Sequence, residues 1–369
     1  MKPLLGSTPI PCIGPAEKDR SRIGLLSGVV ALAVALCCPT SIAGAELEGD
    51  HGIAARYPRD VGIEADPAVL FVENFEEGST ERVFARWEDA APVDRMSLRD
   101  NVPGARSGSR SLLMHKQPGD GSHGAHLYRR LLPDGANGYP QIYARMYVKI
   151  GAGSDPIHHF GANLGGNNPP TPWPAVNAGK RSRGDASFWT GVEPYAETWR
   201  WDFYTYWMEM RSWQNDDGSG SSFTGNAFLR EGAAGGWASA GPEVRRGEWI
   251  CVELMVKVND PVSARNGEQA LWIDGKLVRK DGQIVSHLGA GFPKGSWLRD
   301  KWSPDPRGSP FEGYRWRSSP ELLVNFVWLY VYTEQDGYDI PVYFDDVVVA
   351  TRYIGPLYNG ERPRLDLAR

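Results

Sequence analysis

The chain has 369 residues, of which 41% are hydrophobic and 23% are charged, and its formal net charge at pH 7 is −5. These proportions are those of a globular protein, and the small negative charge excludes the overall basic field that attracts nucleic acid. The 14 tryptophans require either a large core or a surface on which flat ligands stack.

Residues 1–45 have the pattern of an export signal. The basic residues Lys18, Arg20 and Arg22 precede the apolar run IGLLSGVVALAVALCC, and the small-residue sequence AGA follows at 43–45. This order is typical of a cleaved signal peptide. A retained anchor is the alternative, because the run approaches the roughly 20 apolar residues of a membrane-spanning helix. We expect an exported protein, extracellular or in the periplasm or cell envelope, with no transmembrane domain beyond this signal or anchor.

Cysteine use fits an exported chain without disulfides. Three of the four cysteines lie in or before the signal, so cleavage would leave Cys251 alone. A lone cysteine in a strand is more often an inert packing residue than a nucleophile.

The rest of the chain is predicted to be one domain built from strands. Residues 46–67 have the composition of a linker, and residues 357–369 that of a loose tail. Between them, residues 68–356 alternate short runs rich in Val, Ile, Tyr, Phe and Trp with clusters of Gly, Pro, Asn and Asp. Examples are VLFVENF, QIYARMYVKI, EWICVELMVKV, LLVNFVWLYVYTE and VYFDDVVVATRYI. This spacing predicts an all-β antiparallel sandwich or barrel.

Several strands have one aliphatic face and one face that mixes aromatic and charged residues. The runs at 141–150, 249–258 and 327–334 share this alternation. A merely solvated face would favour Lys, Glu, Thr and Ser, so the aromatic residues predict a binding surface. The alternative is that loops cover this face and bury the aromatic rings. The Gly-, Pro- and Asn-rich loop around Trp173 is predicted to be a rim loop that forms one wall of a cleft.

The order of VENFEEG, YARMYVKI, GEWICVELMVKVN, ALWIDGKLV and FDDVVVATRYIGP resembles the concanavalin A-like jelly-roll proteins. That group includes alginate and glucuronan lyases and uncharacterised secreted relatives, and the resemblance spans most of residues 68–356. It implies a jelly-roll sandwich with long rim loops and β-elimination on a uronate-containing polysaccharide. No complete catalytic set matches residue by residue.

Elimination of this kind requires a group that neutralises the uronate carboxylate, a base and an acid. Arg145 is the candidate for the carboxylate, and His159, Tyr204 and Lys257 are candidates for proton transfer. An ion pair of Arg145 with Glu253 is an equally good interpretation, and a structural role for His159 or a solvated strand end for Lys257 stays open. The predicted substrate-binding residues are Tyr143, Tyr147, Asn163, Arg200, Tyr206, Glu253, Trp328 and Tyr330.

Metal and hydrolase motifs are absent from the sequence. There is no HExxH, CxxC or EF-hand loop, and no ExDxxE pair of hydrolase carboxylates. No cofactor is required for the expected chemistry. The resemblance implies that the first and last strands lie side by side, where Glu73, Asp345 and Asp346 could hold a structural calcium ion. Solvated strand ends are the alternative.

Three functional hypotheses follow. The protein is a polysaccharide lyase, a non-catalytic carbohydrate-binding protein, or a structural envelope protein. In each case we expect a monomer, and in the first two a polysaccharide partner.

Overall fold

The computed structural model describes residues 47–103, 108–121, 123–157, 159–175, 178–194, 198–210, 225, 228–229, 241–280, 283–284, 313–333 and 335–358. The chain divides into two units, Met1–Ile42 and Ala43–Arg369, and every described residue belongs to the second. The expected export signal at 1–45 and most of the expected tail lie outside this range. No helix of the described residues is long and apolar enough to cross a membrane.

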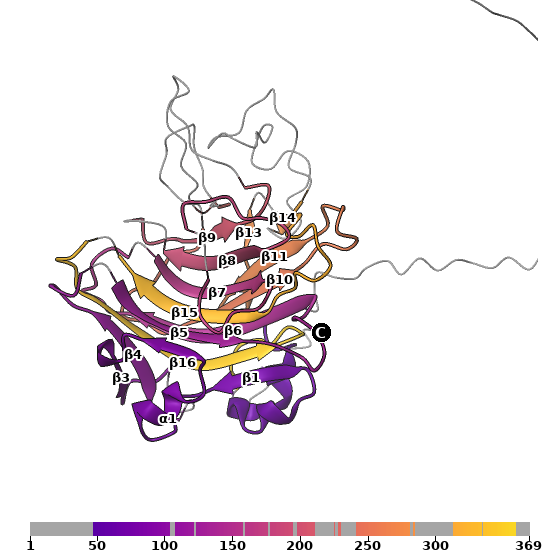
Figure 1. Cartoon of the computed structure of the whole chain (residues 1–369). Coiled ribbons are helices and arrows are strands. Elements are labelled where there is room, and N and C mark those ends of the chain that lie inside the picture. Colours follow the sequence, from indigo (N-terminus) through magenta and orange to yellow (C-terminus); the bar gives the residue numbers. More distant parts are fainter. Residues whose placement is uncertain are drawn as a thin grey trace, which may run out of the picture. The chain divides into compact units, whose positions relative to one another are not determined.

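Two antiparallel sheets make up most of the described chain (Figure 1). In sheet A the strand order is β12-β11-β10-β6-β16-β4-β3, and β1 also pairs with β16. Its strands are β1 (Val69–Glu73), β3 (Met96–Arg99), β4 (Ser111–Lys116), β6 (Gln141–Ile150), β10 (Ile250–Lys257), β11 (Glu268–Ile273), β12 (Lys276–Leu277) and β16 (Ile340–Ala350).

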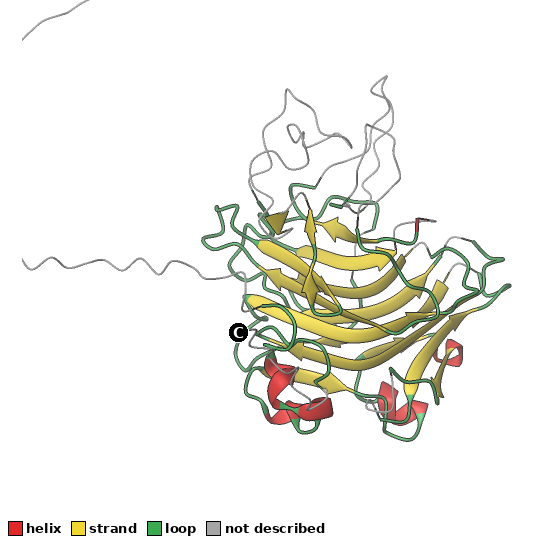
Figure 2. Ribbon diagram, turned by 180° about the vertical axis from the view of Figure 1, so that it is seen from behind, coloured by secondary structure: helices red, strands yellow, loops and turns green. Residues whose placement is uncertain are grey.

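Sheet B has the order β2-β5-β15-β7-β8-β9. Its strands are β2 (Asp89–Ala91), β5 (His123–Arg130), β7 (His159–Asn167), β8 (Ser187–Pro194), β9 (Trp201–Tyr206) and β15 (Phe326–Tyr332), and a separate ribbon pairs β13 (Arg279–Lys280) with β14 (Gln283–Ile284). The helices are short, as Figure 2 shows: α1 (Thr80–Phe84), η1 (Ile53–Arg56), η2 (Pro58–Asp60), η3 (Ile63–Ala65) and η4 (Val93–Arg95). The predicted all-β antiparallel sandwich is confirmed.

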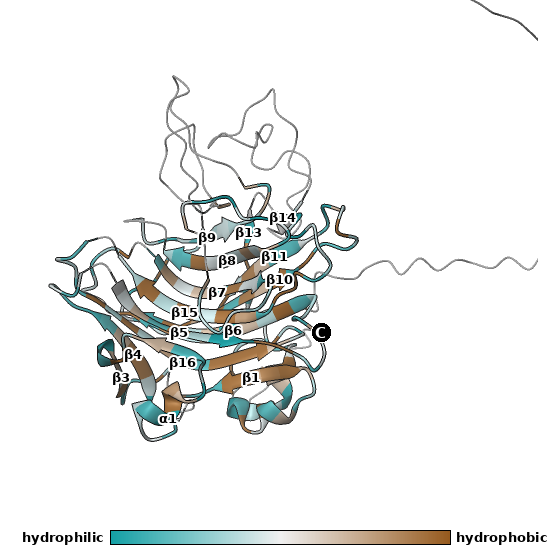
Figure 3. Cartoon of the chain, in the orientation of Figure 1, coloured by the Kyte–Doolittle hydropathy of each residue, from teal (hydrophilic) through white to brown (hydrophobic). Residues whose placement is uncertain are grey.

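The core lies between the two sheets. The rings of Phe160 on β7 and Phe344 on β16 stack across it with centroids 5.7 Å apart. Figure 3 shows hydrophobic residues along β16 and β1. One polar bridge also crosses the core, because Gln269 on β11 accepts a hydrogen bond from Thr190 on β8 (2.8 Å). This bridge satisfies polar groups that would otherwise be costly to bury.

Chain segments from both ends of the domain cover the outer face of sheet A. The backbone N–H groups of Ile53 and Ala54 donate to the carbonyls of Tyr353 (3.1 Å) and Ile354 (2.9 Å). Ile53 is buried with Trp272 and Tyr353 in a second apolar cluster on this face. The segment predicted as a linker at 46–67 is therefore packed on the sheet from residue 47 onward. Its 3₁₀ helices are too short to produce the apolar period by which a sequence pattern is recognised.

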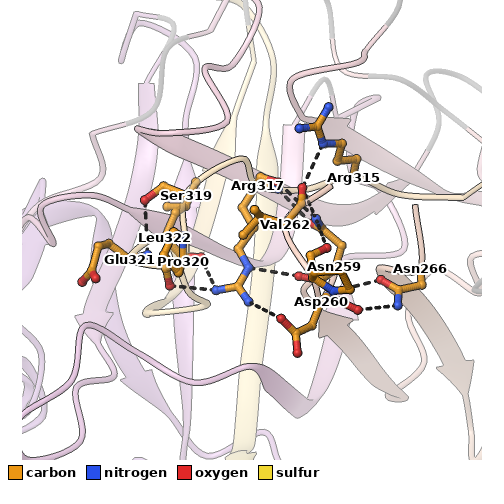
Figure 4. Close-up of polar contacts among 11 residues, drawn as sticks. Asn259, Asp260, Val262, Asn266, Arg315, Arg317, Ser319, Pro320, Glu321 and Leu322 are labelled. Atoms are coloured by element: carbon orange, nitrogen blue, oxygen red, sulfur yellow. Dashed lines mark hydrogen bonds and ion pairs between the residues drawn. The ribbon is translucent and has the colours of Figure 1, made fainter. Parts of the chain in front are cut away.

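A buried arginine joins the turn after β10 to the segment that leads into β15 (Figure 4). The Nε of Arg317 donates to the carbonyl of Asn259 (3.1 Å), and its Nη1 donates to the carbonyl of Pro320 (2.8 Å). The backbone N–H of Arg317 donates to the Oδ1 of Asn259 (3.0 Å). Because one guanidinium satisfies carbonyls from two loops, it holds the start of β15 in place.

We expect Arg317→Ala to lower the free energy of unfolding by about 2–4 kcal/mol, because it leaves several buried carbonyls without donors. Urea denaturation followed by tryptophan fluorescence measures this change. Arg315→Ala is the matched control, since Arg315 is partly exposed and its Nε donates to one carbonyl, that of Val262. Equal losses from both variants would contradict the role assigned to Arg317.

Candidate functional site

The outer face of sheet B, on the side opposite the core, carries a continuous set of aromatic and polar side chains. Strand register aligns Tyr332 with His159 and Trp328 with Asn163, so these side chains share one face. On β8 and β9 the register continues the same face. Its side chains on β7, β8, β9 and β15 are His159, Asn163, Trp189, Glu193, Asp202, Tyr204, Tyr206, Phe326, Trp328, Tyr330 and Tyr332.

A histidine–carboxylate pair lies among these rings. The Nδ1 of His159 is 3.0 Å from the Oε2 of Glu193 on the neighbouring strand β8. The His159 ring lies 4.4 Å from the Tyr204 ring and 5.6 Å from the Tyr332 ring, between centroids. The Tyr204 hydroxyl in turn lies 3.2 Å from the Tyr206 hydroxyl. A titratable imidazole is thus held in place by a carboxylate and surrounded by phenols.

Burial sets the protonation state of these phenols. It raises the pKa of Tyr204 well above its usual value, and the neighbouring Tyr206 and Glu193 act in the same direction. Burial also raises the pKa of Tyr330. Both hydroxyls therefore stay protonated near neutral pH, where they can donate protons and cannot act as phenolate bases.

A second histidine–carboxylate contact lies on the other side of β15. The Nε2 of His126 on β5 is 3.2 Å from the Oδ2 of Asp89 on β2, although the two atoms lack the alignment of a hydrogen bond. His126 is directly opposite Tyr330. The tyrosines of β15 are therefore flanked by one histidine on each side.

The structure divides the predicted site residues between two faces. Those on the outer face of sheet B are His159, Tyr204, Asn163, Tyr206, Trp328 and Tyr330. Arg200 lies at the edge of that sheet, before β9, where its Nη1 donates to the carbonyl of Gly241 (3.0 Å). Those on sheet A, facing away from the core, are Arg145, Tyr143, Tyr147, Glu253 and Lys257. The structure does not bring the two sets together.

The prediction that Arg145 faces a substrate differs from its position in the structure. Its side chain is fully buried beneath the segment at 47–67 and forms an ion pair with Asp60 on η2. Tyr147 lies beside it and accepts a hydrogen bond from the backbone N–H of Leu357 (3.0 Å). Tyr143 packs in the apolar cluster of the same face. The covering segments thus occupy the surface on which these residues were expected to bind sugar.

Lys257 lies at the end of β10, where its Nζ pairs with Glu268 (3.0 Å) and its side chain is 44% exposed. This position matches the alternative interpretation of Lys257, in which it lies at a solvated strand end instead of transferring a proton. Neither Lys257 nor Arg145 lies on the outer face of sheet B.

Glu253 is buried on the outer face of sheet A and accepts hydrogen bonds from the backbone N–H groups of Ile354 (2.8 Å) and Gly355 (2.9 Å). Burial raises its pKa to about 7, and these two bonds oppose that effect. Its carboxylate fixes the covering segment at 351–358 to the sheet, which is a structural role.

The raised pKa of Glu253 predicts a pH effect on stability. Between about pH 4.5 and about pH 7 the folded state binds more protons than the unfolded state, so the free energy of unfolding should fall as pH rises, by up to about 3 kcal/mol. Glu253→Gln should remove this contribution. Urea denaturation at about pH 5 and about pH 8 should therefore show a smaller decrease for the variant than for the wild type. Identical decreases would contradict the assignment.

The three carboxylates predicted to bind calcium are not grouped. Glu73 accepts hydrogen bonds from the backbone N–H of Phe75 (2.9 Å) and the indole of Trp87 (3.3 Å). Asp345 and Asp346 lie at a bulge of β16, and burial, with the charge of Asp346, raises the pKa of Asp345 to about 10. Among the residues that the structure describes, no group of three His, Cys, Asp or Glu side chains is arranged to hold a metal ion.

Sequence reasoning missed Glu193, Trp189, His126 and Asp89. Every residue of β8 is buried, so this strand lacks the alternation that marks one face as polar. His126 and Asp89 become neighbours only through the pairing of β2 with β5. An isolated histidine in a strand gives no signal of such a partner.

Comparisons with known proteins found similarity in structure only. No protein-family model matches the sequence, and neither does any curated protein. The structure is similar to that of the alginate lyase vAL-1 from Chlorella virus, with 13% identity and a TM-score of 0.44 over 77% of this chain and 99% of the other.

The structure also resembles two further proteins. One is a mutant of the alginate lyase Aly36B in complex with an alginate trisaccharide, with 13% identity and a TM-score of 0.43 over 77% of this chain and 98% of the other. The other is the cellulose induced protein Cip1, with 13% identity and a TM-score of 0.41 over 78% and 99%. Similarities at these TM-scores say nothing about the chemistry of this protein. The fold class is therefore assigned from the two antiparallel sheets themselves.

Proposed function

We propose that this protein is exported and that the outer face of its sheet B binds a uronate-containing polysaccharide and cleaves it by β-elimination. The observation that carries the proposal is the contact of His159 with Glu193, next to the protonated phenol of Tyr204. Such a group supplies a base and an acid side by side, as elimination requires.

His159 is the proposed base. A carboxylate can only accept a hydrogen bond, so the Nδ1 of neutral His159 carries the proton and donates it to Glu193. The lone pair of the imidazole is then on Nε2. Glu193 also stabilises the imidazolium that forms when Nε2 takes a proton.

Tyr204 is the proposed acid. The base removes the proton on the carbon next to the uronate carboxylate, the electrons of that C–H bond form a C=C bond, and the glycosidic C–O bond breaks. The leaving oxygen takes the phenolic proton of Tyr204. Proton transfer through solvent then returns the proton from the imidazolium to the phenolate.

The test is the ultraviolet absorbance of the unsaturated uronate product. Purified protein is mixed with alginate, glucuronan, heparinoid and pectic polymers, with and without calcium. We expect absorbance to rise on one polymer, and Tyr204→Phe to lower the rate by about 10²-fold or more, because it removes the proton donor. Asp89→Asn, at the other side of β15, is the control.

Binding without cleavage is the second candidate. It is favoured by one observation: among the described side chains that β7, β8, β9 and β15 place on this face, none is an arginine or lysine, and Arg130, which β5 adds opposite Phe326, pairs with Glu88 (2.8 Å). Flat absorbance across the whole panel, together with retarded migration in gels that contain one of the polymers, would select this candidate and remove the proposed roles of His159 and Tyr204.

A further inference from the structure

Among the described side chains on the outer face of sheet B, three amide or indole N–H donors are buried without an acceptor. They are the Nδ2 of Asn163, the indole Nε1 of Trp189 and the indole Nε1 of Trp328. The three residues are 1%, 4% and 9% exposed. A buried donor without a partner costs about 1–3 kcal/mol, and most native proteins hold only a few. Three on one face therefore require an explanation.

The donors come from three adjacent strands. Asn163 on β7 is directly opposite Trp328 on β15 and Gly191 on β8. The rings of Trp189 and Trp328 lie edge to face, with centroids 6.4 Å apart. The strand pairing thus brings the amide and the two indoles to neighbouring positions.

Packing holds each donor in place. Trp189 stacks on Tyr206 (centroids 4.7 Å apart), and Trp328 stacks on Tyr330 (4.3 Å). The Asn163 amide lies over Gly191, because a Cβ built at that glycine would be 1.6 Å from the Oδ1 of Asn163. Gly191 is in turn opposite Tyr204. The Oδ1 of the amide is therefore directed towards β8 and the proposed acid, and the Nδ2 of the same amide is directed away from them.

Neutral donors of this kind suit a carboxylate. A carboxylate only accepts hydrogen bonds and has about four lone-pair sites, and its bonds from N–H donors are stronger than neutral ones. We propose that Asn163, Trp189 and Trp328 form the subsite that binds the carboxylate of a uronate residue. This inference rests on the proposed function, because it takes a uronate polymer as the ligand.

The subsite has a chemical consequence. Fixed N–H donors that bind the carboxylate stabilise the negative charge that spreads onto it when the neighbouring carbon loses its proton. The three donors therefore fill the role that the sequence assigned to Arg145, without an arginine.

The experiment compares two probes: a polyuronate of defined length that the protein binds, and the same polymer with its carboxyl groups reduced to alcohols. The dissociation constants of both are measured by titration calorimetry for the full-length protein and for three variants. Trp189→Phe and Trp328→Phe remove the N–H and keep an aromatic ring, and Asn163→Asp replaces the donor by an acceptor.

We expect the wild type to prefer the acidic probe by about tenfold or more, as bonds to a charged group predict. Each Trp→Phe variant should reduce that preference several-fold and leave affinity for the reduced probe nearly unchanged. Asn163→Asp should abolish the preference. Trp316→Phe is the matched control, since the Nε1 of Trp316 is also buried without a partner but its ring packs against the core residue Phe188.

Two results would overturn the inference. One is an unchanged preference in both Trp→Phe variants at wild-type stability, which would mean that the indoles bind only water. The other is a preference lost instead in Lys180→Ser/Arg181→Ser, which would place carboxylate recognition on the basic loop whose Gly179 N–H donates to the Tyr206 hydroxyl (3.3 Å). Binding of neither probe by the wild type is a different outcome, because it removes the proposed function itself.

Discussion

Under the proposed elimination, His159→Gln is expected to lower kcat by about 10²–10⁴-fold, with little change in polymer binding. Glutamine keeps a polar side chain of similar length, but it cannot take up a proton near neutral pH. Since Glu193 and the surrounding phenols stay in place, the loss should fall on the chemical step. Initial rates of unsaturated product formation, measured together with polymer affinity, separate the two effects.

A third histidine–carboxylate pair, away from this face, provides the control. The Nε2 of His115 on β4 lies 2.7 Å from the Oδ1 of Asp339, in a partly exposed position on sheet A. His115→Gln should leave kcat unchanged. Full activity of the His159→Gln protein would assign proton abstraction to another group, for which His126 is the next candidate on the same face.

Arg145→Met is expected to lower the free energy of unfolding by about 3–5 kcal/mol, the largest stability effect that we predict. The side chain of Arg145 is fully buried and pairs with Asp60, so its removal leaves a buried carboxylate without its partner. The double variant Arg145→Met/Asp60→Asn should recover part of the loss, because it removes that charge too. Urea denaturation of the single and double variants measures both changes.

Lys257→Met is the control for the stability effect of Arg145→Met. Lys257→Met breaks a partly exposed ion pair and should cost less than about 1 kcal/mol. Neither variant should change kcat in the fraction of protein that stays folded. A loss of activity in Arg145→Met at undiminished stability would return Arg145 to the catalytic role that the sequence suggested.

The two outer faces of the sandwich explain which site residues could be predicted. Alternation along 141–150 and 327–332 correctly separates the core side of each strand from its opposite side. It does not tell which sheet a strand joins. Arg145 and Tyr330 both lie opposite the core, but on different sheets. Residues with the same pattern were therefore assigned to one surface when they belong to two.

For a related reason, the sequence pattern could not predict that the outer face of sheet A is covered. Whether aromatic side chains opposite the core are exposed depends on which distant segments pack on them. Ile53 and Ile63, which cover the outer face of sheet A, occur in single 3₁₀ turns without a repeated period. The contact of His159 with Glu193 depends likewise on the pairing of β7 with β8, which local sequence does not encode.

The meeting on sheet A of segments from the two ends of the described domain also constrains the order of assembly. Ile53 bonds to Tyr353, and β1 pairs with β16, so the first elements of the domain have backbone partners in its last elements. Contacts of such long sequence separation form late and slowly. During synthesis these backbone partners of the amino-terminal segment are therefore made last. A domain that folds late stays unfolded for longer. An unfolded chain is suited to the passage across a membrane that the N-terminal pattern predicts.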